Sequence, residues 1–179
     1  MITRLLLILI LTFSFQTLTK ADDIKDFQIE GFGVGESLLD YVNQKKIKKG
    51  FYPKSKKYVR SWHNNLIDSS DYNGFQFHYK PNDKNFIIHG LSGYIYFYND
   101  MKACLKKQKT IISELDNLFI NKKIPTSKLK KHPSDPTGKS FYTYTSYKLD
   151  DGVISLECTD WSKTLTSNKN WQDNLSVHI

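Results

Sequence analysis

A glycine-rich segment that runs into a serine is the first place in this chain to look for chemistry, because such segments hold phosphates or present nucleophiles. Residues 31–42 read GFGVGESLLDYV. A dinucleotide-binding turn needs glycine at its first, third and sixth positions, and the sixth position here is Glu36. A nucleophile elbow, G-x-S-x-G, needs glycine where this chain has Leu39. The segment therefore matches neither template.

The same segment has a pattern typical of a helix start. Ser37 is followed three residues later by Asp40, as in a capping box, where the two side chains satisfy free amides of the first turn. Asp40 would also complement the helix dipole. The sequence therefore predicts Ser37 and Asp40 as caps of an amphipathic helix that runs to about Lys48. The apolar residues on its predicted inner arc are Leu38, Leu39, Tyr41 and Val42.

Two further patterns bear on phosphate and metal binding. The segment DPTGKS at 135–140 lacks the first glycine of a phosphate loop, where the chain has Pro133. The histidines lie far apart without a ligand spacing such as H-x-x-x-H, so the sequence predicts no metal site, no cofactor and no catalytic residue. A metal site assembled in space from distant residues stays the alternative. These histidines are His63, His78, His89, His132 and His178.

Tyrosines alternate along two expected strands. If the intervening Ile95, Phe97 and Phe141 face the core, the tyrosines form a patch on the other side of the sheet. Amphipathic rings of this kind suit binding of sugars or protein partners. The alternative is that tyrosine is simply a good strand former on a half-exposed face. The predicted patch consists of Tyr94, Tyr96, Tyr98, Tyr142 and Tyr144.

Hydrophobic periodicity gives the elements that must position these residues. An antiparallel α+β fold follows, with about six strands, two main helices packed on one face and an element order that suggests two α-β-β-β halves. The segment between the second helix and the hairpin is polar and proline-rich, which predicts a long loop. The expected strands are 58–63, 75–80, 86–98, a hairpin around Asp151-Gly152 and 174–179; the second helix is 100–119, capped by Asp100, and the loop is 121–138.

The chain has two cysteines, Cys104 and Cys158. Cys104 lies on the apolar face of the second predicted helix, and Cys158 shares a strand face with Ile154 and Leu156, so both point toward one helix-sheet interface. The sequence therefore predicts a disulfide, which closes a loop of about 55 residues and contributes roughly 4 kcal/mol through the unfolded state. Two buried free thiols are the alternative.

The N-terminus has the organisation of a secretory signal peptide. A short cationic stretch precedes about eleven apolar residues, too few to span a bilayer, and Thr19 and Ala21 occupy the positions of a small-residue cleavage site. We expect residues 1–21 to be removed, leaving a single domain over 22–179 that is periplasmic or secreted without membrane insertion. An uncleaved anchor is the alternative.

The charge of the chain does not point to nucleic acid. The formal net charge of +8 falls to +6 when residues 1–21 leave with Arg4 and Lys20, and Arg60 is then the only arginine. Base-edge and phosphate recognition rely on the bidentate fork of arginine, which lysine lacks. A lysine-coated, solvated surface is the better interpretation, with weak attraction to anionic envelope surfaces as an alternative.

Two resemblances bear on function. The block GESL at 35–38 resembles the signature of GDSL esterases, which implies Ser37 as nucleophile; that family needs a D-x-x-H block, and Asp173 and His178 are five residues apart. The whole chain resembles an uncharacterised family of small exported proteins from marine Pelagibacter-type bacteria, which implies no known activity. The segments that carry this second resemblance are ADDIKDFQIEGFGVGESLLDYV, GFQFHYK, CLKKQK, KHPSDPTGKS and DWSK.

The start of the first predicted helix is also similar to helix openings of small outer-membrane-assembly and β-lactamase-inhibitor-like folds, which implies a fold only. The leading functional prediction is a non-enzymatic module that binds a protein or envelope component. The alternative is an envelope hydrolase assembled from separate strands, such as a histidine with Asp160 or Asp173. Titratable groups close together in a cleft would indicate the enzyme, and a flatter aromatic face the binding module.

Overall fold

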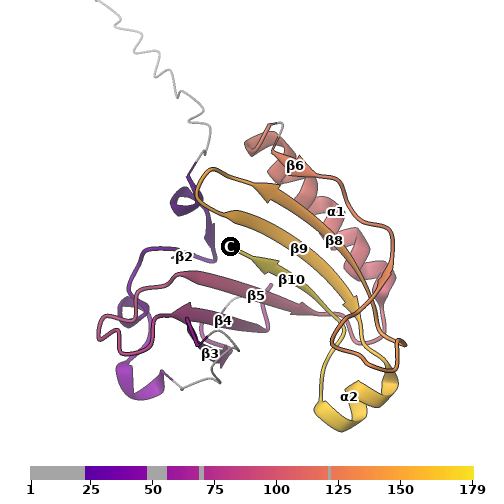
Figure 1. The fold of residues 1–179 in the computed structure, drawn as a ribbon, viewed down its shortest axis with the longest axis horizontal. Coiled ribbons are helices and arrows are strands. Elements are labelled where there is room, and N and C mark those ends of the chain that lie inside the picture. The colour runs from indigo at the N-terminus through magenta and orange to yellow at the C-terminus, as the bar shows by residue number, and fades with distance from the viewer. Residues whose placement is uncertain (1–22, 48–55, 69–70, 121) are drawn as a thin grey trace, which may run out of the picture.

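The structure is a computed structural model of the chain, and it describes residues 23–47, 56–68, 71–120 and 122–179 (Figure 1). The predicted signal peptide, residues 1–21, lies outside the described residues. In the part of the chain that the structure describes, none of the helices combines the length and the apolar character needed to cross a membrane.

The fold is α+β, as the sequence predicts. The α-helices are α1 (Met101–Leu118) and α2 (Lys163–Lys169), and short 3-10 turns cover Ile24–Asp26, Leu38–Asp40 and Gln44–Lys46. The strands are β1 (Gln28–Ile29), β2 (Phe32–Gly33), β3 (Val59–Asn64), β4 (Gly74–Tyr79), β5 (Gly90–Tyr96), β6 (Lys123–Ile124), β7 (Lys130–Lys131), β8 (Phe141–Lys148), β9 (Val153–Asp160) and β10 (Asn174–His178).

The main sheet is built from two antiparallel meanders. Its described strands follow the order β3-β4-β5-β10-β9-β8-β6, with β7 also paired to β8, and β1 and β2 form a separate pair. The last strands of the two meanders, β5 and β10, pair antiparallel at the centre, with Leu175 opposite Ile95. The expected six strands are therefore extended by short edge strands, and the two halves join through their final strands.

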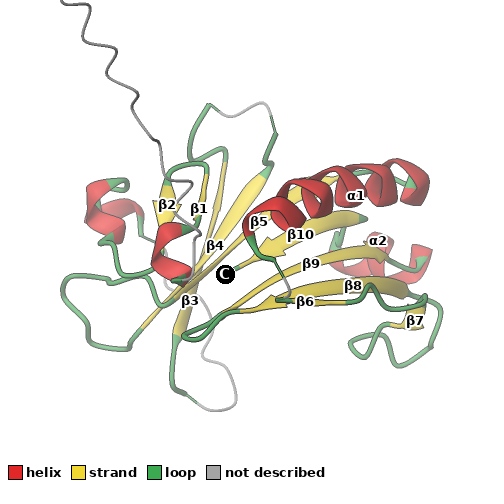
Figure 2. Ribbon diagram, turned by 90° about the horizontal axis from the view of Figure 1, so that it is seen from above, coloured by secondary structure: helices red, strands yellow, loops and turns green. Residues whose placement is uncertain are grey.

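One face of the second meander is covered by α1 (Figure 2). The helix forms because apolar residues recur at three-and-four spacing, and it begins at Asp100, whose side chain accepts a hydrogen bond from Ala103 N at 2.9 Å. Its buried residues include Cys104, Ile112 and Leu115, which pack toward β9 and β10. This part of the prediction is confirmed.

The two cysteines meet at this helix-sheet interface. Cys104 on α1 and Cys158 on β9 lie at disulfide distance, with Cα atoms 6.0 Å apart, and both side chains are buried. The geometry therefore agrees with the pairing expected from the sequence.

The predicted helix from Ser37 to Lys48 is wrong. The described part of this segment forms two separate 3-10 turns, and it runs beside residues 86–88, with Gly35 N donating to Ile88 O and Leu38 N donating to Phe86 O. These backbone bonds hold the segment too extended for a helix to propagate through it. The segment instead covers the first meander, where Phe32 packs edge-on against rings of β4.

Ser37 is still a cap, but of a single turn. Its hydroxyl accepts a hydrogen bond from Leu39 N at 3.2 Å and donates to Asn85 O at 2.6 Å. Asp40 is exposed and makes no capping-box bond among the described residues. The carboxylate that organises this turn is Glu36, which accepts from Gly33 N at 2.7 Å and from the hydroxyl of Tyr41.

Three other boundaries differ from the sequence-based expectation. The long strand expected over 86–98 is regular only within β5, because Phe86 and Tyr98 have positive φ angles of 50° and 27° and turn the chain. The expected loop 121–138 contributes β6 and β7 to the edge of the sheet, since its backbone pairs with β8. The helix α2, which links β9 to β10 at one end of the sheet, was not expected.

Candidate functional site

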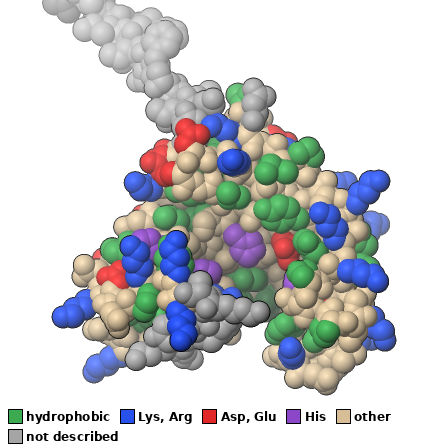
Figure 3. Space-filling model, in the orientation of Figure 1, with side chains coloured by type: hydrophobic (Ala, Val, Ile, Leu, Met, Phe, Trp, Pro, Cys, Tyr) green, Lys and Arg blue, Asp and Glu red, His purple; other side chains and the backbone are tan. Residues whose placement is uncertain are grey.

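The face of the sheet opposite α1 carries most of the chemistry of the chain. Side chains alternate along each strand, so Cys158 and Leu175 point toward α1 while Glu157 and Ser176 point to the other side. We call this other side the open face; it includes Tyr94, Ser176, Glu157 and the residues in register with them. Figure 1 views the sheet from this side, and Figure 3 shows a hollow there, with histidine and acidic side chains on its floor.

The strand register arranges four of the five predicted tyrosines in two rows across the open face. One row runs Tyr96, Asn174, Thr159, Tyr142, and the next runs Tyr94, Ser176, Glu157, Tyr144. In each row the tyrosines lie on β5 and β8, three strands apart, which is about 14 Å at the usual strand spacing. The tyrosines therefore do not form one continuous patch. They flank a polar strip on β10 and β9.

Tyr98 does not belong to either row. It follows β5 at a positive φ, its side chain is 64% exposed, and its ring lies 6.0 Å from the ring of Tyr96. The predicted alternation fails at this residue because the strand has already ended.

His178 is the last residue of β10 and lies at one end of the polar strip, in the row after Ser176. Its Nδ1 atom is 2.6 Å from Ser92 Oγ and its Nε2 atom is 2.9 Å from Ser176 Oγ. Burial, with a smaller contribution from nearby His78, lowers the pKa of His178 to about 4. The ring is therefore neutral at pH 7 and donates one hydrogen bond while accepting the other.

A second histidine meets a carboxylate on the same face. His132 Nε2 lies 3.4 Å from Glu157 Oε1, and the two side chains are 12% and 23% exposed. Glu157 Oε1 also accepts a hydrogen bond from Thr159 Oγ1 at 2.8 Å. A histidine-carboxylate pair therefore occurs on this face, but its carboxylate is Glu157 and neither of the two aspartates expected from the sequence.

Asp160 and Asp173, the carboxylates suggested by the sequence as histidine partners, lie elsewhere. Asp173 accepts hydrogen bonds from Asn99 N at 2.9 Å and Trp161 N at 2.7 Å, so it holds the turns at the end of the sheet. Burial, followed by the charge of Asp173, raises the pKa of Asp160. The structure gives neither of them a histidine contact among the described residues.

Aromatic rings line both sides of the polar strip. On the β5 side, the ring of Trp62 lies 4.7 Å from that of Tyr94, and it reaches across Gly74, where an added Cβ would come within 2.9 Å of the indole. On the β8 side, the ring of His132 lies 5.3 Å from Tyr142 and 4.2 Å from Trp161. We call these two groups the aromatic walls.

The sequence-based reasoning missed the tryptophan and histidine members of the walls and the polar strip. The signal for Trp62 was present, because Arg60, Trp62 and Asn64 alternate with Val59, Ser61 and His63 along β3. His132 comes from the segment expected to be a loop, and only the pairing of β7 with β8 brings it onto the open face. No residue spacing in the sequence predicts the pairing of β7 with β8.

Among the described residues, no group of three or more histidine, cysteine, aspartate or glutamate side chains could hold a metal ion. The chain matches no family model, no curated protein and no solved structure in comparisons with known proteins.

Proposed function

We propose that this protein is an exported, non-enzymatic binding module of the cell envelope, and that the open face contacts its ligand. Export rests on the expected signal peptide and agrees with a cysteine pair at disulfide distance, since disulfides persist in oxidising compartments. The observation that carries the binding proposal is the pair of aromatic walls on either side of the polar strip.

The chemistry of the open face favours an envelope glycan as the ligand. Sugar rings present C–H faces that stack on aromatic rings, and hydroxyl groups that both donate and accept hydrogen bonds. The polar strip forms a hydrogen-bonded layer under the rings, in which Ser176, Thr159 and Asn174 are each less than 10% exposed. The partly exposed Glu157 and the tyrosine hydroxyls beside the strip are the groups that would meet the sugar hydroxyls. The centre of a protein-protein interface is instead typically apolar, with the polar groups at its rim.

The environment of His178 supports binding rather than general-base catalysis. Both ring nitrogens face serine hydroxyls, so no carboxylate orients the ring as in a catalytic triad. Its lowered pKa of about 4 also makes it a weak base at neutral pH. A neutral, buried ring between two hydroxyls suits a fixed support beneath the binding face, not a group that moves a proton.

The test is binding of chitohexaose and soluble peptidoglycan fragments to the secreted protein, measured by isothermal titration calorimetry. Tyr96→Ala combined with Tyr142→Ala removes one tyrosine from each side of the polar strip and should weaken binding by roughly tenfold or more, given the usual contribution of aromatic contacts. Tyr41→Ala is the matched control, because Tyr41 is 41% exposed and lies in the segment that covers the other face. Unchanged affinity in the double variant, or binding to envelope proteins alone, would overturn the glycan proposal.

One observation favours a second candidate, an envelope hydrolase. His132 and Glu157 form a histidine-carboxylate pair at 3.4 Å on the open face, beside Thr159. This is the arrangement in which a carboxylate orients a general base. Glu157→Gln separates the two candidates, because it should abolish release of glycan fragments by an enzyme but alter only the affinity of a binding module.

A further inference from the structure

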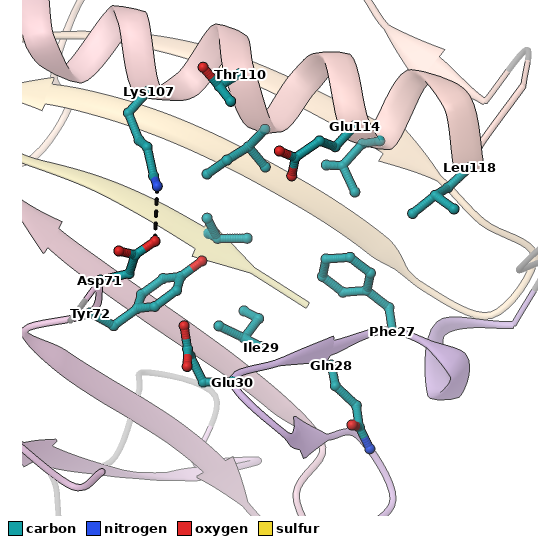
Figure 4. Close-up of a pocket in the computed structure, with 13 residues that line it drawn as sticks. Phe27, Gln28, Ile29, Glu30, Asp71, Tyr72, Lys107, Thr110, Glu114 and Leu118 are labelled. Carbon is teal, nitrogen blue, oxygen red and sulfur yellow. Dashed lines mark hydrogen bonds and ion pairs between the residues drawn. The ribbon is translucent and has the colours of Figure 1, made fainter. Parts of the chain in front are cut away.

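A pocket of about 350 Å³ lies on the α1 side of the sheet, away from the open face. It is bounded by α1, by the segment around β1 and by the turn before β4, and Figure 4 shows the residues that line it. Its volume is at the lower end of the range of small-molecule sites. The pocket does not share a residue with the polar strip or the aromatic walls, so its role is independent of the glycan proposal.

The deepest part of the pocket is apolar. Ile29, Leu115 and Val177 are 3%, 2% and 1% exposed and form the hydrophobic floor. Phe27 and Leu118 lie at one end of the pocket. Leu118 is 43% exposed, so the apolar lining reaches the protein surface at this end. A ligand in this pocket therefore needs an apolar body.

The other end of the pocket, around Asp71 and Glu30, is acidic, and Glu114 adds a third carboxylate from α1, on the side toward Leu118 (Figure 4). The carboxylates of Glu30, Asp71 and Glu114 come from three separate segments, whereas Lys107 is the one cationic side chain among the described residues of the lining. Lys107 Nζ pairs with Asp71 Oδ2 at 2.9 Å, which leaves an excess of negative charge from the other two. This excess is notable on a chain with a formal net charge of +8.

Tyr72 lies between the acidic end and the floor. Its ring packs on Gly93, where an added Cβ would come within 2.6 Å of the ring, and its hydroxyl points into the pocket (Figure 4). Burial first, and then the charges of Glu30, Asp71 and Glu114, raise the pKa of Tyr72 to about 12. The same negative potential that disfavours a phenolate favours a cation beside the ring, and the ring face itself attracts cations.

We propose that this pocket binds a small organic ammonium ion, with its apolar chain against Ile29, Leu115 and Phe27 and its charged head between Tyr72 and the carboxylates of Glu30 and Glu114. The apolar lining favours a ligand with an alkyl chain, and the carboxylates favour a ligand with a positive charge. An alcohol of the same length would lose the electrostatic attraction, and a carboxylate would be repelled.

The test uses the full secreted protein and a series of probes with one chain length: hexylammonium, hexanol and hexanoate, with ethylammonium as the short-chain cation. Binding is followed by amide shifts in ¹H–¹⁵N NMR spectra, at residues 27–30 and 110–118. Hexylammonium should bind most tightly, and added salt should weaken it because the carboxylates are exposed. The proposal would be overturned if hexanol or hexanoate bound as tightly as hexylammonium. It would also be overturned if hexylammonium caused no shift at these amides up to about 10 mM.

Two variants test the two ends of the pocket separately. Glu30→Gln with Glu114→Gln should weaken hexylammonium binding by roughly threefold to tenfold, as expected for exposed charge pairs. Asp40→Asn with Asp150→Asn is the matched control, because both carboxylates are exposed and lie outside the pocket.

Leu118→Ser alters the apolar end at an exposed position and so leaves folding intact. It should weaken hexylammonium binding without affecting ethylammonium. Equal losses in the control pair, or an unchanged affinity in both pocket variants, would contradict the proposed site.

Discussion

The imidazole Nδ1 of His178 lies 2.6 Å from the hydroxyl oxygen of Ser92 on the neighbouring strand. Its Nε2 atom faces Ser176 in the same way, at 2.9 Å. A protonated ring would donate at both positions, so this geometry does not itself forbid the charge. Removal of the ring from water does disfavour it, because little solvent remains to stabilise an imidazolium.

This burial makes the stability of the protein depend on pH. The pKa of His178 falls from 6.5 to about 4 in the folded state, so between these values the unfolded chain binds the proton more readily. Stability should therefore be complete above pH 6.5 and decline as the pH falls towards 4, by up to about 3 kcal/mol from this residue. Urea denaturation at pH 7.0, 5.5 and 4.5 measures the decline.

The variant His178→Gln isolates this effect, since it keeps hydrogen-bonding capacity but does not titrate. It should be less stable at pH 7 and lose stability less steeply towards pH 4.5. His89→Gln is the control, because His89 is exposed, and it should retain the wild-type slope. If both variants kept that slope, burial of His178 would not be its source.

The Cys104–Cys158 pair should contribute to stability through the unfolded chain. The two residues are 54 positions apart, and a cross-link of this loop length restricts the unfolded ensemble by about 4 kcal/mol in the chain-entropy model. Replacing both cysteines with serine should lower the free energy of unfolding by that order, measured without reductant. Detection of two free thiols in the denatured, unreduced protein would contradict the pairing.

Local periodicity was enough to predict those helices and strands in which the apolar residues of the repeating pattern are also the buried residues. The helix from Met101 to Leu118 and most of strand β4 show a 3.6- or 2-residue period, and one face of each is buried. The strands β8 and β9 were also expected, but three consecutive residues of each are buried, so their burial does not alternate throughout. The segment after Ser37 has a helical pattern too, but it pairs with residues 86–88, which are far away in sequence. Pairing across that distance overrides local propensity, and no local pattern reveals it.

The candidate site could be predicted only in part, for a related reason. Alternation along single strands placed Tyr94, Tyr96, Tyr142 and Tyr144 on one face. The order of the strands decides what lies between those tyrosines, and the sequence does not specify that β10 inserts between β5 and β9. His178 became a neighbour of Tyr94 through that insertion, whereas Glu157 faces Tyr144 across the predicted hairpin.

The turn at Glu36 and Ser37 should depend more on the carboxylate than on the predicted cap. Glu36 accepts hydrogen bonds from Gly33 N, Gln28 Nε2 and the hydroxyl of Tyr41, whereas Ser37 Oγ makes two bonds. Ser37→Ala should cost about 1 kcal/mol, as for other cap residues, and Glu36→Ala should cost more because three donors lose their acceptor. Asp40→Ala, with no such bond, is the control. Equal thermal midpoints for all three variants would show that these bonds are not stabilising.

Gly93 should be required because the Tyr72 ring occupies the space of its missing side chain. An added Cβ would lie 2.6 Å from two ring atoms of Tyr72 and 3.1 Å from Ile29 Cγ2, closer than packed carbon atoms approach. Gly93→Ala should therefore lower the free energy of unfolding by about 1–3 kcal/mol, the usual range for overpacking a core. Tyr72→Ala should also destabilise, since it leaves a gap. Together the two changes should cost less than the sum of their separate effects, because the alanine methyl then enters the space that the ring leaves. Urea denaturation of the two single variants and the double variant measures this coupling, and strict additivity would mean that Tyr72 does not set the requirement for glycine.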